Sequence, residues 1–98
     1  MYKRIKLTLA KRSTIAVGAV VGLDVNEVVE VPTSLSGDQT YATLHLRKQH
    51  AMKGLIQTVT TPLPDGWLGK PCVVVKNDSA TLFELLEGEE IGEVWVFS

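Results

Sequence analysis

The chain has 98 residues and a mass of 10.7 kDa, which is the size of one domain spanning 1–98. Hydrophobic residues make up 45% of it and charged residues 21%, which excludes a disordered chain. Ten Lys and Arg against eleven Asp and Glu give a net charge of −1, so no global positive field exists to hold a polyanion. The apolar run 15–23 is about half of a membrane span, so we expect no membrane partner.

Alternating residues predict strands through the N-terminal third of the chain. Residues 3–9 alternate apolar with basic or polar side chains, as in a half-buried strand. The run 14–21 is rich in β-branched residues and almost wholly apolar, which is typical of a strand buried on both faces. Residues 25–31 alternate again until Pro32 ends that strand, and a polar turn over 33–38 follows.

The segment 40–55 fits either a strand or a helix. As a strand, it points the aliphatic side chains of the even positions 42–46 inward. As a helix, it places apolar residues at three- and four-residue spacing. The long side chains of 47–53 favour helix, so we expect a strand that gives way to a short helix or loop near Arg47.

The C-terminal half returns to strand patterns separated by turn residues. We expect strands over 55–61, 71–76, 80–86 and 91–97, with the second and third joined as a hairpin at Asn77–Ser79. Short strands at this spacing predict a mainly β fold, a small barrel or sandwich of roughly six to eight short strands. At most one short helix is expected, within 40–54.

A single cysteine limits the redox chemistry of the chain. Cys72 precedes three valines, so we expect it to be a buried core residue, and it cannot form a disulfide within the chain. The absence of disulfides favours a reducing compartment, the cytoplasm or, for a virus-encoded protein, the virion.

Charges are divided between the two ends of the chain. Residues 1–12 hold five Lys and Arg and no acid, whereas 77–98 hold six Asp and Glu and no base. These are either two solvated strand faces or one paired set, in which the first and last strands lie side by side within a chain or between subunits. The candidate interaction residues are Lys3, Arg4, Lys6, Glu87, Glu89, Glu90, Glu93 and Trp95.

Few residues suggest catalysis. The two histidines, His45 and His50, lie on opposite faces of a strand, and no carboxylate or thiol near them in the sequence completes a metal site. The chain contains no GxSxG, HExxH, CxxC or P-loop motif. We therefore expect no enzyme, no catalytic residue, no metal or other cofactor, and no small-molecule substrate.

A basic cluster in the middle of the chain is the candidate nucleic-acid patch. It comprises Tyr41, His45, Arg47, Lys48 and Lys53, a set of cations with an aromatic ring suited to phosphates and a stacked base. If these cations converge with Arg4 and Lys6 on one open face, the patch reaches several phosphates.

The stretch LPDGWLGKPCVVV over 63–75 resembles the turn and second strand of AbrB-type swapped-hairpin proteins, above all the archaeal, transposon-associated members. The resemblance implies a dimeric transcriptional regulator or antitoxin that binds DNA through basic residues. Asp65 departs from the pattern, because a basic residue usually follows the proline. The same residues also describe a turn, Pro64 to Gly66, followed by a strand that enters the core.

Two functions follow from these observations. The first is a non-catalytic small β assembly or interaction protein, a homo-oligomer or a structural, adaptor or inhibitor component of a larger viral or mobile-element complex. Apolar residues on both faces of 14–21, 72–76 and 91–97 favour it, because one small monomer has little interior to cover them. The alternative is the AbrB-type DNA-binding regulator, with nucleic acid as its partner.

Overall fold

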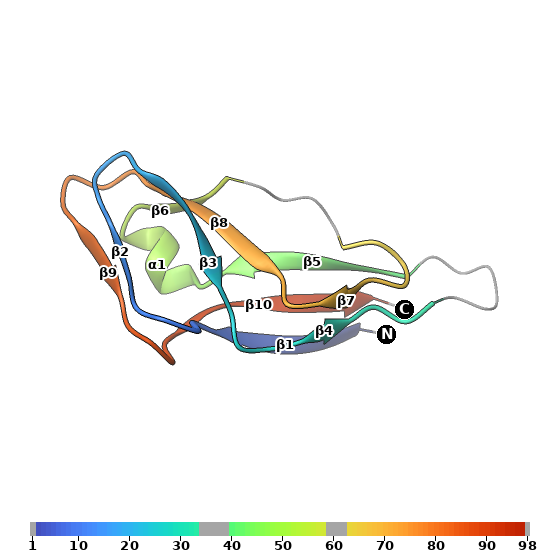
Figure 1. Cartoon of the computed structure of the whole chain (residues 1–98). Coiled ribbons are helices and arrows are strands. Elements are labelled where there is room, and N and C mark those ends of the chain that lie inside the picture. Colours follow the sequence, from blue (N-terminus) through green and yellow to red (C-terminus); the bar gives the residue numbers. More distant parts are fainter. Residues whose placement is uncertain (1, 34–39, 59–62, 98) are drawn as a thin grey trace.

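The protein is mainly β, as the sequence predicts. The computed structural model describes residues 2–33, 40–58 and 63–97, which form an elongated body of 49 × 20 × 18 Å (Figure 1). Over these residues there are eight strands of three or more residues, two strands of two residues and one short helix. The helix lies within 40–54, which confirms the predicted change from strand to helix near Arg47.

The strands form two three-stranded antiparallel sheets, in the orders β1-β10-β5 and β3-β8-β6, and two small ribbons, β2-β9 and β4-β7. The elements are β1 Tyr2–Thr8, β2 Ser13–Ile15, β3 Val20–Asp24, β4 Val29–Glu30, β5 Tyr41–Leu46, α1 Lys48–Met52, β6 Leu55–Gln57, β7 Leu68–Gly69, β8 Cys72–Asn77, β9 Phe83–Leu85 and β10 Glu90–Phe97. In Figure 1 both termini lie at one end, and α1 lies with β2 and β9 at the other.

The inward side chains of the two large sheets form one hydrophobic core. Alternation along each strand turns every second residue inward, and the outward positions are polar or are apolar residues that stay partly exposed, such as Val20 and Ile56. The fully or almost fully buried members from these sheets are Leu7, Leu23, Ala42, Leu55, Val73, Val75, Ile91, Val94 and Val96.

The basic and acidic ends of the chain meet, because the first and last strands are paired. In the register of β1 and β10, Lys6 lies opposite Glu93 and Arg4 lies opposite Trp95. Arg4 forms an ion pair with Glu93, and at the far end of the molecule Arg12 forms one with Glu84. These oppositely charged residues therefore neutralise each other within one chain.

Two predicted elements are wrong, and the strand predicted over 25–31 is reduced to β4, Val29–Glu30, and a bridge at Val25. The polar turn predicted over 33–38 lies outside the described residues apart from its first position. The run 14–21 is not one strand: Gly18, at φ +79°, turns the chain between β2 and β3. Val17 and Val20 beside this turn are each 56% exposed. The hairpin at Asn77–Ser79 does not form, because β9 pairs with β2 and not with β8. Asn77 is buried instead and donates its side-chain amide to the carbonyls of Ile15 and Thr81, each at 2.9 Å.

Cys72 is exposed, which corrects the expectation of a buried thiol. In β8 the inward positions are Val73, Val75 and Asn77, so Cys72 faces outward by strand alternation. No helix among the described residues is long and apolar enough to cross a membrane.

Candidate functional site

An open groove of about 450 Å³ lies where the end of β5 and the start of α1 meet β1 and β10. It gathers residues from segments far apart in the sequence. The lining residues are Arg4, Lys6, His45, Leu46, Arg47, Lys48, Gln49, Glu90, Gly92, Glu93 and Trp95. Four cationic side chains and two carboxylates among them leave the groove with a net charge of +2, whereas the whole chain carries −1.

The wall from Arg47 to Gln49 is positioned by the end of the strand β5. The Arg47 N–H donates to the carbonyl of Ile91 at 2.8 Å, which extends the pairing with β10 by one residue. The Arg47 carbonyl then accepts from the N–H of Ala51 at 3.1 Å, as the first turn of α1. The change from strand to helix therefore occurs at this residue, and Arg47, Lys48 and Gln49 line the groove beside β10.

Gly92 allows β5 and β10 to approach closely at the groove. A Cβ atom on Gly92 would lie 2.2 Å from the carbonyl oxygen of His45, far inside an ordinary contact. Gly92 pairs with Leu46 on one side and with Leu7 on the other, so all three strands of the sheet depend on this position. Only glycine fits here without displacing backbone.

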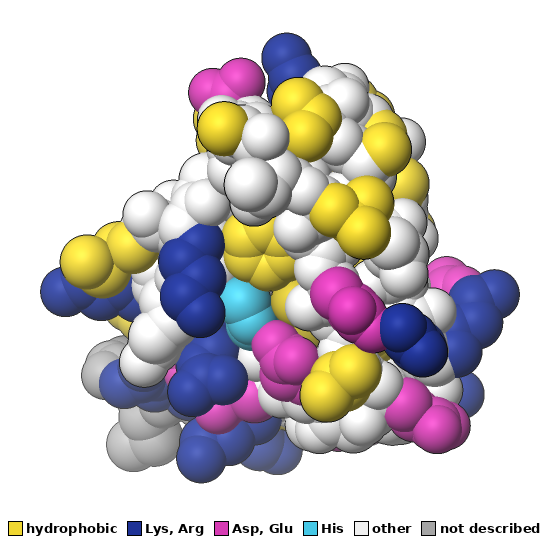
Figure 2. Space-filling model, turned by 90° about the vertical axis from the view of Figure 1, so that its left-hand side faces the viewer, with side chains coloured by type: hydrophobic (Ala, Val, Ile, Leu, Met, Phe, Trp, Pro, Cys, Tyr) yellow, Lys and Arg dark blue, Asp and Glu magenta, His cyan; other side chains and the backbone are white. Residues whose placement is uncertain are grey.

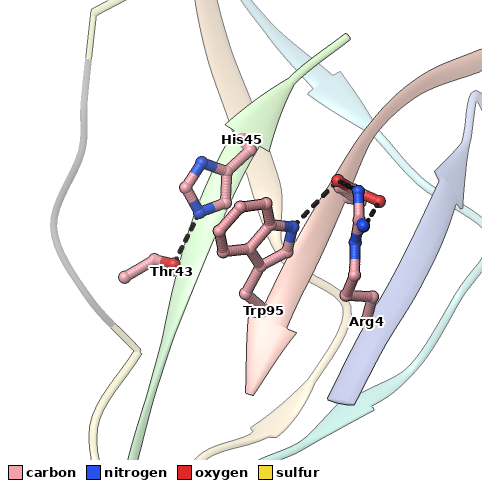
Figure 3. A network of polar contacts seen from close by, with 5 residues as sticks. Arg4, Thr43, His45 and Trp95 are labelled. Carbon is pink, nitrogen blue, oxygen red and sulfur yellow. Dashed lines mark hydrogen bonds and ion pairs between the residues drawn. The ribbon is translucent and has the colours of Figure 1, made fainter. Parts of the chain in front are cut away.

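A connected set of polar and aromatic contacts covers the outer face of the same sheet (Figure 3). Arg4 forms an ion pair with Glu93 and donates from Nε to its carboxylate at 3.2 Å, while Trp95 Nε1 donates to the same carboxylate at 2.8 Å. The Arg4 guanidinium, and after it the Trp95 indole, hold the pKa of Glu93 below its ordinary value of 4.5. Glu93 is therefore a persistent carboxylate in this wall.

The Trp95 ring lies between a cation and a second aromatic ring. The Arg4 guanidinium carbon is 5.1 Å from the ring centroid, and the His45 ring centroid is 4.2 Å away. In Figure 3, Arg4 and His45 lie on opposite sides of the indole, and His45 Nε2 is 2.7 Å from the Thr43 hydroxyl. The aromatic contacts continue along the sheet, because Trp95 contacts Phe97, which stacks on Tyr41 at 5.0 Å.

The groove brings together residues from both predicted sets. From the interaction set it contains Arg4, Lys6, Glu90, Glu93 and Trp95, and from the nucleic-acid set it contains His45, Arg47 and Lys48. The remaining predicted residues lie outside its lining: Lys3, Tyr41, Lys53, Glu87 and Glu89. Among these, Lys53 lines a second groove of about 430 Å³ with the loop before β9.

A buried histidine and a half-buried glutamate form a pair that no pattern in the sequence predicts. His50, in α1, is 6% exposed, and its Nε2 is 2.5 Å from the carboxylate of Glu89. These residues are 39 positions apart, so no local pattern links them. Seen from the end formed by α1, β2 and β9, a histidine lies in a hollow with basic side chains on one side and acidic ones on the other (Figure 2).

A metal site built from protein ligands is not found among the described residues of the groove. Within the part of the chain that the structure describes, no three His, Cys, Asp or Glu side chains gather closely enough to bind one. The two groove carboxylates, Glu90 and Glu93, fall short of such a site.

Comparison with known proteins identifies the fold. No protein-family model matches the chain, and no curated protein sequence matches it. The dUTPase of EIAV matches with a TM-score of 0.78 at 13% identity, over 100% of this chain and 88% of that chain. A variant dUTPase of Staphylococcus bacteriophage 80alpha, solved with dUpNHpp, matches with 0.80 at 13%, over 99% and 81%. The dUTPase from phage phi11 of S. aureus matches with 0.80 at 12%, over 96% and 75%. A further variant of the phi11 dUTPase coordinates a structural Mg(II) ion.

These similarities correct three expectations. The AbrB resemblance is wrong, because β7 pairs with β4 and β8 lies between β3 and β6, all within one chain. The turn at Pro64–Gly66 does form, but it belongs to a different fold. The expectations of a non-catalytic assembly protein with no small-molecule substrate, and of no enzyme, are also contradicted, because the similar structures are dUTPases, which are enzymes that act on a nucleotide. The chain has the fold of these dUTPases.

Proposed function

We propose that the protein is a hydrolase of nucleoside triphosphates that binds its substrate in the basic groove, with dUTP as the first substrate to test. The observation that carries the proposal is the similarity to dUTPases over almost the whole chain, with TM-scores of 0.78 and 0.80. The groove supplies independent support, because its charge is opposite in sign to that of a triphosphate.

The groove offers several donors to phosphate oxygens. Lys6 and Lys48 are exposed, and neither forms an ion pair with another described residue. Arg47 adds a planar guanidinium with several N–H donors, oriented by its bond to Gln49 at 3.1 Å. Charge-assisted bonds of this kind are short and strong, so the three cations together suit a polyphosphate chain.

One groove carboxylate fits the role of a general base. Glu93 is committed to Arg4 and Trp95, whereas Glu90 is half-buried at the start of β10 and faces the same groove. In the proposed reaction Glu90 accepts a proton from a water molecule as the water oxygen attacks a phosphorus atom. The new P–O bond forms as the P–O bond of the phosphoanhydride breaks, and the leaving phosphate carries away the electron pair. No step uses a metal ion held by the protein.

Hydrolysis of dUTP, followed by chromatographic separation of the nucleotides, tests the proposal. The assay is run with Mg²⁺ and with a chelator, because nucleotides in solution carry the ion themselves. Arg47→Glu with Lys48→Glu should raise KM by at least about tenfold, since two charge-assisted contacts are replaced by repulsion. Lys53→Glu with Lys70→Glu is the matched control, because it reverses two charges at exposed lysines outside the groove lining.

A second variant separates chemistry from binding. Glu90→Gln should lower kcat by about 100-fold or more and leave nucleotide affinity nearly unchanged, because the amide cannot accept the proton. If the wild-type protein neither hydrolyses nor binds any nucleoside triphosphate, the proposed function is wrong. If Glu90→Gln keeps full activity, another group is the base.

We also propose that the protein self-associates, as a homo-oligomer. Support comes from the outer face of the β3-β8-β6 sheet, where Val20 is 56% and Ile56 is 44% exposed. Both residues lie opposite Lys76 in their strand pairs, so they flank one position of the central strand. A second copy of the chain would cover this apolar surface.

A further inference from the structure

Two walls of the groove come from separate elements that must be held together. One wall is the start of α1, with Arg47 and Lys48, and another is the start of β10, with Glu90. The helix α1 has five residues, Lys48–Met52, and no side chain among the described residues caps its first turn. A helix this short is not stable by itself, so its position depends on contacts with its neighbours.

His50 joins α1 to the residue that precedes β10. Its Nε2 lies 2.5 Å from a carboxylate oxygen of Glu89, and the two side chains are 7% and 27% exposed. Because an ionised carboxylate only accepts, Nε2 carries the hydrogen atom and donates it. Little water reaches this hydrogen bond, so it holds α1 against β10 more firmly than an exposed bond would.

Both partners of this hydrogen bond are themselves held in place. The second carboxylate oxygen of Glu89 accepts from the N–H of Leu86 at 3.2 Å, and the Glu89 carbonyl accepts from the N–H of Leu9 at 2.9 Å. The His50 ring meets the Phe83 ring edge-on, with centroids 6.0 Å apart. The pair is therefore a rigid link between the helix and the turn that leads into β10.

The other ring nitrogen of His50 indicates that packing alone does not explain a histidine here. Its Nδ1 is buried and has no hydrogen-bond partner among the described residues. A buried polar atom without a partner destabilises the fold, and an apolar side chain of similar size would avoid that cost. The hydrogen bond from Nε2 to Glu89 is what such a side chain could not supply.

We infer that His50 and Glu89 are positioning residues, whose hydrogen bond fixes these two walls of the groove relative to each other. The inference rests on the proposed function: the cations of one wall bind the triphosphate, and the Glu90 carboxylate of the other must reach the attacking water. Neither His50 nor Glu89 lines the groove, so they act through the residues that do. A general base works only within hydrogen-bond reach, and a displacement of about 1 Å lowers the rate by about 100-fold.

Steady-state hydrolysis of dUTP, or of another nucleoside triphosphate that the wild type accepts, tests the inference. Glutamine places an amide nitrogen near the position of His50 Nε2, whereas asparagine places its amide near Nδ1, so the two variants are matched in polarity and differ in the bond to Glu89. His50→Asn and Glu89→Ala should each lower kcat by at least about tenfold and leave KM within about threefold, because flexible cations still reach the phosphates.

Two further variants serve as the rescue and the control. His50→Gln keeps a donor for Glu89 and should restore kcat to within about threefold of the wild type. Glu87→Ala removes an exposed carboxylate from the same turn, outside the groove lining, and should change neither kcat nor KM. Circular dichroism at the assay temperature gives the folded fraction of each variant, so that kcat is expressed per folded molecule.

The outcomes separate this inference from the proposed function. A wild-type kcat per folded molecule in His50→Asn and Glu89→Ala would overturn the inference and leave a nucleotide hydrolase standing, and so would a His50→Gln variant no more active than His50→Asn. The double variant, His50→Asn with Glu89→Ala, should lose no more than the weaker single variant, because both changes break one bond; additive losses would overturn the inference as well. Absence of hydrolysis of every nucleoside triphosphate by the wild type would overturn both the inference and the proposed function.

Discussion

Replacement of Gly92 by alanine should destabilise the sheet that carries the groove. The new Cβ would lie 2.2 Å from the His45 carbonyl oxygen, whereas ordinary contacts begin at 3.4 Å. The strand β5 must therefore move by about 1 Å, and a backbone carbonyl cannot rotate away as a side chain can. Overpacking of this kind costs about 1–3 kcal/mol, and we expect the upper part of that range. For a domain of this size the melting temperature should fall by about 10–20 °C.

Thermal and urea unfolding, followed by circular dichroism, measure this loss, and Gly22→Ala is the matched control. Gly22 is also a strand glycine with close pairing, but the atom nearest its added Cβ is the Sγ of Cys72 at 2.8 Å. That atom ends an exposed side chain that can rotate, so the control should change stability by less than about 0.5 kcal/mol. If Gly92→Ala is equally neutral, the close approach of β5 and β10 described above is incorrect.

Three further predictions concern charge, burial and assembly. The pKa of Glu93 is lowered in the folded state, so its contribution to stability is present above pH 4.5 and is lost as the pH falls through the folded pKa. The difference in free energy of unfolding between wild type and Glu93→Gln, measured in urea, should therefore be larger at about pH 7 than at about pH 3, and an equal difference would refute the prediction. His50→Ala removes the buried partner of Glu89 and should lower the free energy of unfolding by about 1–3 kcal/mol in the same assay, and His50→Gln should recover part of the loss. An unchanged free energy of unfolding for His50→Ala would contradict the pairing. In light scattering across a concentration series the wild type should exceed the monomer mass, and Val20→Lys with Ile56→Lys should reduce it to the monomer; a monomeric wild type would remove the self-association proposal.

Local patterns in the sequence determined the fold class and several elements. Strand alternation predicted the inward residues of the strand β5, and the long side chains after it predicted the change to helix near Arg47. The division of charge between the two ends indicated, as one of two interpretations, that the first and last strands pair. The register of β1 and β10 and the ion pair of Arg4 with Glu93 show this pairing. The sequence predicts these features because each depends on residues that are neighbours along one strand, or on a net charge that extends over a whole segment.

The tertiary structure alone decided the turn at Gly18, the exposure of Cys72 and the composition of the groove. An apolar run does not show where the chain turns, because the position of the turn depends on which strands pair with the segments on either side of it. Here β2 pairs with β9 and β3 pairs with β8. The groove joins Arg4 and Arg47 to Glu90 through the order β1-β10-β5, and His50 finds Glu89 across 39 residues. Contacts of this kind follow from strand order and register, which single-chain patterns of hydrophobicity leave open. For the same reason the sequence pointed to an assembly protein, and the arrangement of its strands in space revealed the fold of a dUTPase.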